Sequence, residues 1–375
     1  MLDTVGFVLF ILAILLILYK ERRKIEIEGI LVLRRTSRGK RAVERFAVRH
    51  ARIFGILMQV AGVISIPLVA ISSLYIVKNA IDIAAGVTQA GAMLVLPAPV
   101  SEARAMPGVF LMPWYFWVIG VVSVIIPHEL FHAIAARLER IRIKSFGYLF
   151  LLFLPGAFVE PDERELKRSK LSTKLRVYGA GSFANLLVAG GVLLLSYFVL
   201  IAFYTPYGLS YRGVVVDSPA HHANLSGTIL KVNNVSITSQ DALERVLKEI
   251  PPYTRVQIET TAGVFNLTTA AREDNPNMSY IGIAGPFSTA YTVKRMFAPL
   301  SFAISFLSAL LMWIFVLNLG IGMVNMLPIK PLDGGMIFEA IATKLSKHAG
   351  RHLTNLVSIM MFSFLLFNLF GGYLV

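Results

Sequence analysis

The sequence predicts a polytopic α-helical membrane protein with one polar α+β domain inserted between its transmembrane helices. Three observations indicate this fold class. The 375 residues are 56% hydrophobic and 15% charged, whereas soluble domains are about 45–50% apolar and about 25% charged. Six apolar runs reach or approach the roughly 17–25 residues that a helix needs to cross a bilayer. One long polar interval, residues 207–292, separates the fourth run from the fifth.

The six apolar runs are the candidate transmembrane helices. They cover approximately residues 4–19, 54–77, 114–136, 179–204, 297–325 and 353–373. The first run is short enough for a signal peptide. However, it is followed by a basic segment and not by a small-residue cleavage site. We therefore expect a retained membrane anchor. The expected regions are 1–53 (anchor and basic segment), 54–206 (first half of the membrane core), 207–292 (inserted domain) and 293–375 (second half of the membrane core).

The lysines and arginines between the spans predict the orientation. Segment 20–53 carries twelve of them and 137–177 carries ten, whereas 78–113 carries only Lys78 and Arg104. Cytoplasmic loops are enriched in these residues, so we expect both basic segments in the cytoplasm and 78–113 outside a cell membrane that the chain crosses several times. The net charge of +14 is then explained by topology and by contact with the lipid bilayer. No nucleic-acid partner is expected.

The polar interval has the strand and helix signals of an α+β domain. Strands are predicted at 213–216, on either side of Asn233-Asn234 within 227–237, and in a hairpin at 255–270, with an amphipathic helix at 239–250. This order, together with the stretch 218–237, resembles a circularly permuted PDZ domain of the kind attached to bacterial and archaeal proteases. Thr228 stands where that pattern has an aspartate. The predicted orientation places the PDZ-like domain outside the cytoplasm.

A histidine–glutamate motif lies in the third apolar run. His128, Glu129 and His132 interrupt a stretch that is otherwise apolar enough for lipid, where a charged side chain costs at least about 2.5–3.5 kcal/mol. Histidines four residues apart lie one above the other on a helix, so both can bind one metal ion while Glu129 acts as general base. The chain has no cysteine, so thiolate metal sites are excluded. The alternative is a polar helix contact or a proton relay.

Asp333 is a candidate third metal ligand. Two histidines leave a tetrahedral zinc site one protein ligand short, with one position open for water. Asp333 follows the fifth apolar run in a segment, 325–335, that prolines and glycines interrupt. Broken backbone at membrane depth is tolerated only where it is buried in protein or lines a wet cavity. The alternative is that Asp333 caps the helix that follows it.

Taken together, these features resemble the site-2 protease family of intramembrane metalloproteases. The matching features are the HExxH motif in a span, the PDZ-like insertion, the small-residue element at Gly181 and Asn185, and an NxxPxxxLDG pattern at Asn325, Pro328, Leu332, Asp333 and Gly334. They cover over half of the chain. The resemblance implies Zn²⁺ bound by His128, His132 and Asp333, with Glu129 as the general base.

Two asparagines are further candidates, for contact with the substrate or with an oxyanion. Asn185 could equally be a helix–helix contact among small residues, and Asn325 could instead shape the turn that carries Asp333. In the family, the region matching 142–161 forms a membrane-dipping β-hairpin whose edge could hold an extended substrate. A partial extra span or an interfacial segment is the alternative for 142–161.

The resemblance also implies a function and partners. The expected reaction is hydrolysis of peptide bonds in or near the transmembrane segment of single-span membrane proteins, after an upstream site-1-type protease has trimmed them. The active site is expected toward the cytoplasmic side, since His128 and Asp333 lie toward the cytoplasmic ends of their spans. Two other functions compete with this one: a metal or proton transporter, and a catalytically inactive receptor or scaffold that binds peptides through the PDZ-like domain.

Overall fold

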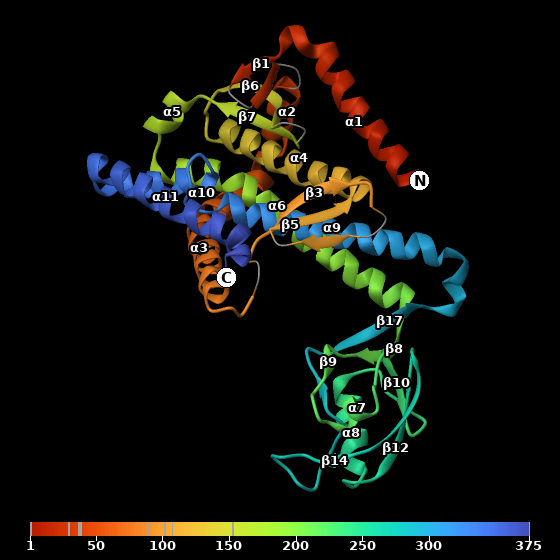
Figure 1. The fold of residues 1–375 in the computed structure, drawn as a ribbon. Helices are drawn as coiled ribbons and strands as arrows, with labels where there is room; N and C mark the ends of the chain where they lie inside the picture. The colour runs from red at the N-terminus through yellow and green to blue at the C-terminus, as the bar shows by residue number, and fades with distance from the viewer. Residues whose placement is uncertain are drawn as a thin grey trace. The chain divides into compact units, whose positions relative to one another are not determined.

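The computed structural model describes residues 2–28, 31–36, 40–88, 91–100, 103–106, 108–151 and 154–374. The chain divides into two compact units, Met1–Leu194 with Ala309–Val375, and Leu195–Ser308. In the described part of the chain, six helices are long and apolar enough to cross a membrane. They are α1 (Leu2–Glu21), α3 (Ala51–Ala84), α4 (Trp114–Leu138), α6 (Leu171–Phe203), α9 (Ser301–Asn325) and α11 (Lys347–Phe370) (Figure 1). The predicted multi-pass helical membrane protein is confirmed.

Two of these helices extend well beyond the predicted apolar runs. α3 has 34 residues where 54–77 was predicted, and α6 has 33 residues and begins at Leu171 rather than at 179. A helix of that length is about 50 Å long, whereas the hydrocarbon core of a bilayer is about 30 Å thick. Hydropathy marks only the part of a helix that lies in lipid, and the backbone hydrogen bonds continue past it into polar sequence.

The predicted hairpin at 142–161 forms, but as half of a larger sheet. The antiparallel order is β1 (Glu26–Glu28), β2 (Leu31–Thr36), β6 (Ile143–Leu151) and β7 (Leu154–Pro161). The two strands from the basic segment 20–53 were not predicted. Residues 152–153 of the predicted hairpin lie outside the described residues. Because 142–161 forms strands, the alternative of a partial extra helical span is wrong, whereas an interfacial location stays a prediction. β7 is left as an edge strand that packs against α4 (Figure 1).

A second small sheet precedes α4. β3 (Leu94–Ala98) runs parallel to β5 (Val109–Pro113), and β4 (Arg104–Met106) pairs with the other edge of β5. β5 leads directly into α4, and the indole Nε1 of Trp117 donates to the carbonyl oxygen of Val95 at 3.0 Å. These contacts fix the start of the helix that carries His128 and His132.

Close packing between α4 and α9 sets the register of the two helices. Gly120 of α4 lies against Leu317 of α9, and a Cβ at Gly120 would be 2.4 Å from Cδ1 of that leucine. Next to this contact, Nδ2 of the fully buried Asn318 donates to Oγ of Ser123 at 3.0 Å. Glycine and asparagine are common at helix contacts in membranes because they permit close approach and interhelical hydrogen bonds.

Three shorter helices complete the first unit. α2 (Lys40–Arg49) precedes α3, α5 (Glu163–Arg168) joins β7 to α6, and α10 (Asp333–Leu345) lies between α9 and α11. The side chain of Asp162 caps α5 by accepting from the backbone N–H groups of Arg164 and Glu165. α10 follows a turn, residues 326–332, that contains Pro328 and Pro331.

The second unit contains the polar interval 207–292, together with the end of α6 and the start of α9, and it holds both strands and helices. Its main sheet has the order β13 (Gly263–Thr268), β12 (Arg255–Thr260), β10 (Ile229–Val232), β8 (Tyr204–Ser210) and β17 (Ser288–Val293), with β11 (Val235–Ser236) also paired to β10. Helices α7 (Pro219–His222) and α8 (Gln240–Glu249) accompany it, with the short strands β9 (Gly213–Val214), β14 (Ala270–Ala271), β15 (Ser279–Tyr280) and β16 (Ile283–Ala284). The predicted helix and hairpin are confirmed. The strand predicted at 213–216 is confirmed only in its first half.

Local signals account for these elements. Asn233 and Asn234 both have positive φ, 47° and 67°, as the two-residue turn between β10 and β11 requires. Ser239 caps α8, its side chain accepting from the N–H of Ala242. Alternating apolar residues of the strands and one face of α8 form the core: Leu209, Ile229, Val232, Ile237, Leu243, Leu247, Val256, Ile258 and Leu267.

Candidate active site

Two histidines and an aspartate from distant parts of the sequence meet in the first unit. His128 and His132 lie on α4, and Asp333 is the first residue of α10. The two Nε2 atoms are 3.1 Å apart, and Oδ2 of Asp333 lies 3.4 Å from Nε2 of His128 and 3.3 Å from Nε2 of His132. The three side chains are only 10, 12 and 17% exposed. The structure thus brings together the three residues that the sequence suggested as metal ligands.

The triangle of ligand atoms fits a tetrahedral divalent cation. Two ligand atoms at about 2.0–2.1 Å from one ion are roughly 3.3–3.4 Å apart when the angle between them is tetrahedral. The observed separations are 3.1–3.4 Å. Oδ2 of Asp333 is buried and has no hydrogen-bond partner in the described part of the chain, which is costly for a charged group. A cation bound to the three atoms would compensate that charge.

Residues of α6 contact the Nδ1 atom of each imidazole, on the side of the ring that does not face Asp333. Nδ1 of His132 lies 2.7 Å from the carbonyl oxygen of Val177. Because a carbonyl only accepts, Nδ1 carries the proton and Nε2 keeps its lone pair for a cation. Nδ1 of His128 lies 3.1 Å from the amide nitrogen of Asn185, and Oδ1 of Asn185 is buried with no hydrogen-bond partner among the described residues. If the amide of Asn185 is flipped, its Oδ1 accepts a hydrogen bond from Nδ1–H of His128. The buried oxygen then has a partner, and Nε2 of His128 keeps its lone pair for a cation.

Asn185 is therefore a positioning residue for His128. It is fully buried on α6, and the amide contacts the ring nitrogen that does not face Asp333. Its expected contact with a substrate or an oxyanion stays a prediction.

Replacing Asn185 with alanine should weaken metal binding by about 10–100-fold, because partners behind a ligating histidine fix its orientation and tautomer. The measurement is a titration of the purified protein with zinc against a competing chelator. Asn318→Ala is the matched control, since it removes a buried amide that bonds Ser123 on α4 away from the cluster. Equal metal affinity in Asn185→Ala and the native chain would contradict the positioning role.

Asp333 does not cap α10. The N-cap residue of that helix is Leu332, and no side chain makes a capping hydrogen bond, so the alternative considered from the sequence is wrong. The two glycines after Asp333 pack on the backbone of the preceding turn. A Cβ at Gly334 would lie 2.1 Å from the carbonyl oxygen of Met326. No larger residue fits there, and the close approach brings the first residue of α10 to the histidines.

A serine on α11 forms hydrogen bonds with the backbone of the same turn. Oγ of Ser358 accepts from the N–H of Lys330 at 3.2 Å and donates to the carbonyl oxygen of Pro328 at 3.1 Å. Ser358 is mostly buried, and its two bonds satisfy backbone groups of a turn that has left the helix. The position of Asp333 therefore depends on α9, α10 and α11 together.

Glu129 lies beside the cluster and contacts the edge strand β7. Its Oε2 accepts from the backbone N–H of Val159 at 2.7 Å. In the β6–β7 ladder Val159 pairs with Phe146, and the N–H that reaches Glu129 is on the free edge of the sheet. Oε1 makes no other hydrogen bond within the described part of the chain. One oxygen of the predicted general base is thus held by the backbone while the other is available for proton transfer.

Gly181 of α6 packs directly against both imidazoles. A Cβ at this position would lie 2.3 Å from Nε2 of His132 and 2.6 Å from Nε2 of His128. Both are the atoms that face Asp333, so the added methyl group would stand in the space where a cation would bind. The sequence suggested Gly181 as part of a small-residue element, and the packing gives the physical reason for its size.

Replacing Gly181 with alanine should abolish stoichiometric metal binding, because the methyl group would overlap the ligand atoms. Gly190→Ala is a matched control on the same helix, where nothing lies within 4 Å of an added Cβ. Alanine is favoured over glycine in a helix by about 1 kcal/mol, so a loss of metal in Gly181→Ala alone cannot come from helix propensity. Zinc per chain, measured by elemental analysis after gel filtration, decides the outcome. Full zinc content in both variants would show that the packing is looser than described.

The position of Asn325 does not assign it a role in the candidate site. It is the last residue of α9 and is half-buried, near the turn that leads to Asp333. Its expected contact with substrate stays a prediction. No motif in the sequence points to Val159, Val177 or Ser358. The first two act through their backbone groups, and Ser358 bonds to the backbone of the turn.

A multi-span helical core that joins an HExxH helix to a distant aspartate is the architecture of a membrane metalloprotease. The model of Peptidase family M50 matches residues 116–368, a region that contains His128, Glu129, His132 and Asp333. The chain therefore belongs to Peptidase family M50, the site-2 protease family. It is also similar to uncharacterized protein MJ0971 of Methanocaldococcus jannaschii, with 26% identity over 364 residues that cover 94% of this chain and 90% of that protein.

Proposed function

We propose that this protein is a zinc endopeptidase that cuts single-span membrane proteins in or near their transmembrane segments. The observation that carries the proposal is the triangle of His128, His132 and Asp333 next to Glu129. His128, Glu129 and His132 lie on α4, a helix long and apolar enough to span a membrane. Three protein ligands with one open position are typical of catalytic zinc rather than structural zinc. When bound, zinc lowers the pKa of a coordinated water to about 7 and polarises the carbonyl group of the substrate.

The residues of the chain supply the proton transfers. Glu129 takes the proton of the attacking water and delivers it to the leaving amine, as a general base and then a general acid. The N–H of Val159 holds one carboxylate oxygen at 2.7 Å and fixes the direction of the other. The Nδ1 atoms of His128 and His132 both contact groups on α6, so their Nε2 atoms are the ones directed toward Asp333 and available as ligands.

The free edge of β7 is the proposed substrate-binding element. A helical substrate must unwind before it is cut, because its carbonyl groups are bonded within the helix. An edge strand offers unpaired backbone groups to an extended peptide. β7 ends the four-stranded sheet, and its outer edge reaches Glu129 through Val159. A substrate strand added to β7 would lie alongside the general base.

The second unit is proposed to be a PDZ-like filter outside the cytoplasm. Support comes from its element order, in which β10 and β11 around Asn233-Asn234 are followed by α8 and the β12–β13 hairpin. Such a unit would admit substrates that an upstream site-1-type protease has already trimmed, by binding a new C-terminus or by excluding bulky external domains. The basic segments favour a cytoplasmic location for the end of α4 that carries the metal ligands.

The test uses the purified full chain, reconstituted with a single-span reporter protein. We expect cleavage within or next to the apolar segment of the reporter, located by mass spectrometry of the products. Chelation with 1,10-phenanthroline should stop cleavage and stoichiometric zinc should restore it. Cleavage that survives complete removal of zinc would overturn the proposal.

The same preparation distinguishes the other two functions. A transporter would move metal ions into sealed vesicles and leave the reporter intact. A scaffold would bind peptides through the second unit with neither uptake nor cleavage. The metal cluster and the family favour the protease, because neither alternative requires Glu129 beside the ligands.

A further inference from the structure

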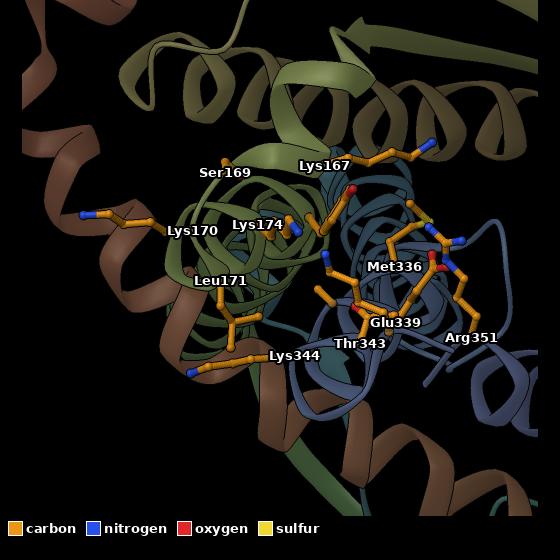
Figure 2. A pocket seen from close by; sticks show the side chains of 13 residues that line it. Lys167, Ser169, Lys170, Leu171, Lys174, Met336, Glu339, Thr343, Lys344 and Arg351 are labelled. Atoms are coloured by element: carbon orange, nitrogen blue, oxygen red, sulfur yellow. The ribbon is translucent and has the colours of Figure 1, made fainter. Parts of the chain in front are cut away.

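A pocket with a cationic lining lies in the first unit, between the start of α6, the length of α10 and the start of α11 (Figure 2). Its volume is about 570 Å³. The cations that line it are Lys167, Lys170, Lys174, Lys344, Lys347 and Arg351, and we call it the cationic pocket. One carboxylate, Glu339, is also in the lining, and it forms an ion pair with Lys330 at 3.0 Å.

Most of this positive charge is uncompensated. Lys167 pairs with Glu163, with 2.7 Å between Nζ and Oε2. The other five cations make no ion pair with any carboxylate in the described ranges of the chain. Figure 2 shows the side chain of Arg351 beside Met336 and Glu339, and shows Lys170 and Lys344 directed away from the other labelled side chains. Like charges gathered around one concave surface raise the local concentration of anions there.

The location of the pocket suggests what kind of anion it takes. α6 and α11 are both candidate membrane spans, and the cationic pocket lies where both begin, at Leu171 and Lys347. Leu171 and Lys347 precede the apolar runs 179–204 and 353–373, so the pocket lies on the polar side of both runs, where the headgroup region borders the hydrocarbon core. Leu171, Met336 and Ala340 add apolar surface to the lining. A ligand with an anionic head and an apolar body would match both the cationic and the apolar residues of the lining.

We propose that the cationic pocket binds the headgroup of an anionic phospholipid. Basic pockets between transmembrane helices are suited to such headgroups, and a volume of about 570 Å³ is typical of sites for small molecules rather than for a peptide segment. The phosphate would contact Lys174 and Arg351, which come from two different spans. The bound lipid would therefore link α6 to α11, across the helix that begins with Asp333.

The test compares lipid retention by the full chain and by a double variant, Lys174→Gln with Arg351→Gln. Each protein is purified in neutral detergent, exposed to equal amounts of phosphatidylglycerol and phosphatidylcholine with the same acyl chains, and analysed by native mass spectrometry. The native chain should retain phosphatidylglycerol selectively. The double variant should bind it about 30-fold more weakly, because each basic side chain at an anionic surface contributes roughly a factor of five. Proteolysis is not measured, so this outcome is independent of the proposed function.

The control is a double variant with the same loss of charge at the ends of other spans, Arg23→Gln with Arg52→Gln. Both residues are exposed and neither lines the cationic pocket, so this variant should retain phosphatidylglycerol like the native chain. Equal retention by the native chain and the pocket variant would overturn the proposal. So would preferential binding of an acidic peptide, or of free sn-glycerol 3-phosphate as tight as that of the lipid, if either is lost in the pocket variant.

Discussion

Replacing Glu129 with glutamine should slow cleavage of a single-span reporter by about 10²–10⁴-fold, the range that positioned proton transfer contributes. Glutamine has nearly the same shape and its amide oxygen can still accept from the N–H of Val159, which now lies 2.7 Å from Oε2. The contact with β7 and the zinc content should therefore be retained. The measurement is the initial rate of reporter cleavage at saturating zinc, with zinc per chain determined on the same sample.

The control for this variant is Glu163→Gln, which removes an exposed carboxylate whose ion pair, within the described ranges, is with Lys167. It should cleave the reporter at the native rate, since exposed ion pairs contribute about 0–1 kcal/mol to stability. Undiminished cleavage by Glu129→Gln would mean that the general base lies elsewhere. Loss of zinc from Glu129→Gln would instead mean that its carboxylate supports the metal site directly.

The second large effect is expected from Asp333→Ala, which removes one of three ligands. Loss of a residue that hydrogen-bonds to a metal ligand already lowers metal affinity by about 10–100-fold. Loss of the ligand itself should lower the affinity further. Zinc bound to the purified chain should fall from one per molecule to well below that. The free energy of unfolding of the metal-free protein should change little, because Asp333 makes no capping hydrogen bond. A first-turn carboxylate contributes about 0.3–1 kcal/mol through the helix dipole.

Asp333→His is the informative companion, because histidine is also a zinc ligand. Partial recovery of zinc in Asp333→His, without recovery in Asp333→Ala, would show that position 333 coordinates the ion. Zinc bound by Asp333→Ala at native affinity would contradict a site with three protein ligands. In that case the separations of 3.3–3.4 Å between Asp333 and the two histidines would need another explanation.

Two features of the fold connect the catalytic group to its surroundings. Glu129 is bonded to the edge of β7, so the strand that would hold a substrate also orients the general base. Asp333 is placed by a turn that α11 holds through Ser358. The candidate metal site is thus assembled from α4, α6 and α10, with α9 and α11 holding the turn before Asp333, and any movement of these helices would change the distances among His128, His132 and Asp333.

The sequence by itself determined the features that depend on neighbours along the chain. Apolar runs predicted all six spans, and the spacing of His128 and His132 placed both on one face of a helix. Turn and cap residues such as Asn233, Asn234 and Ser239 predicted the elements of the second unit. These predictions succeed because helix periodicity, strand alternation and turn conformation are local properties.

Only the tertiary structure decided how distant segments meet. The distances from Asp333 to the histidines, the amide of Asn185 behind His128, and the contact of Gly181 with both rings arise from the packing of separate helices. The pairing of β2 with β6 and the bond from Val159 to Glu129 likewise join segments without any shared motif. Hydropathy and spacing describe one segment at a time, whereas a metal site requires that atoms from several segments come within a few ångströms of one another.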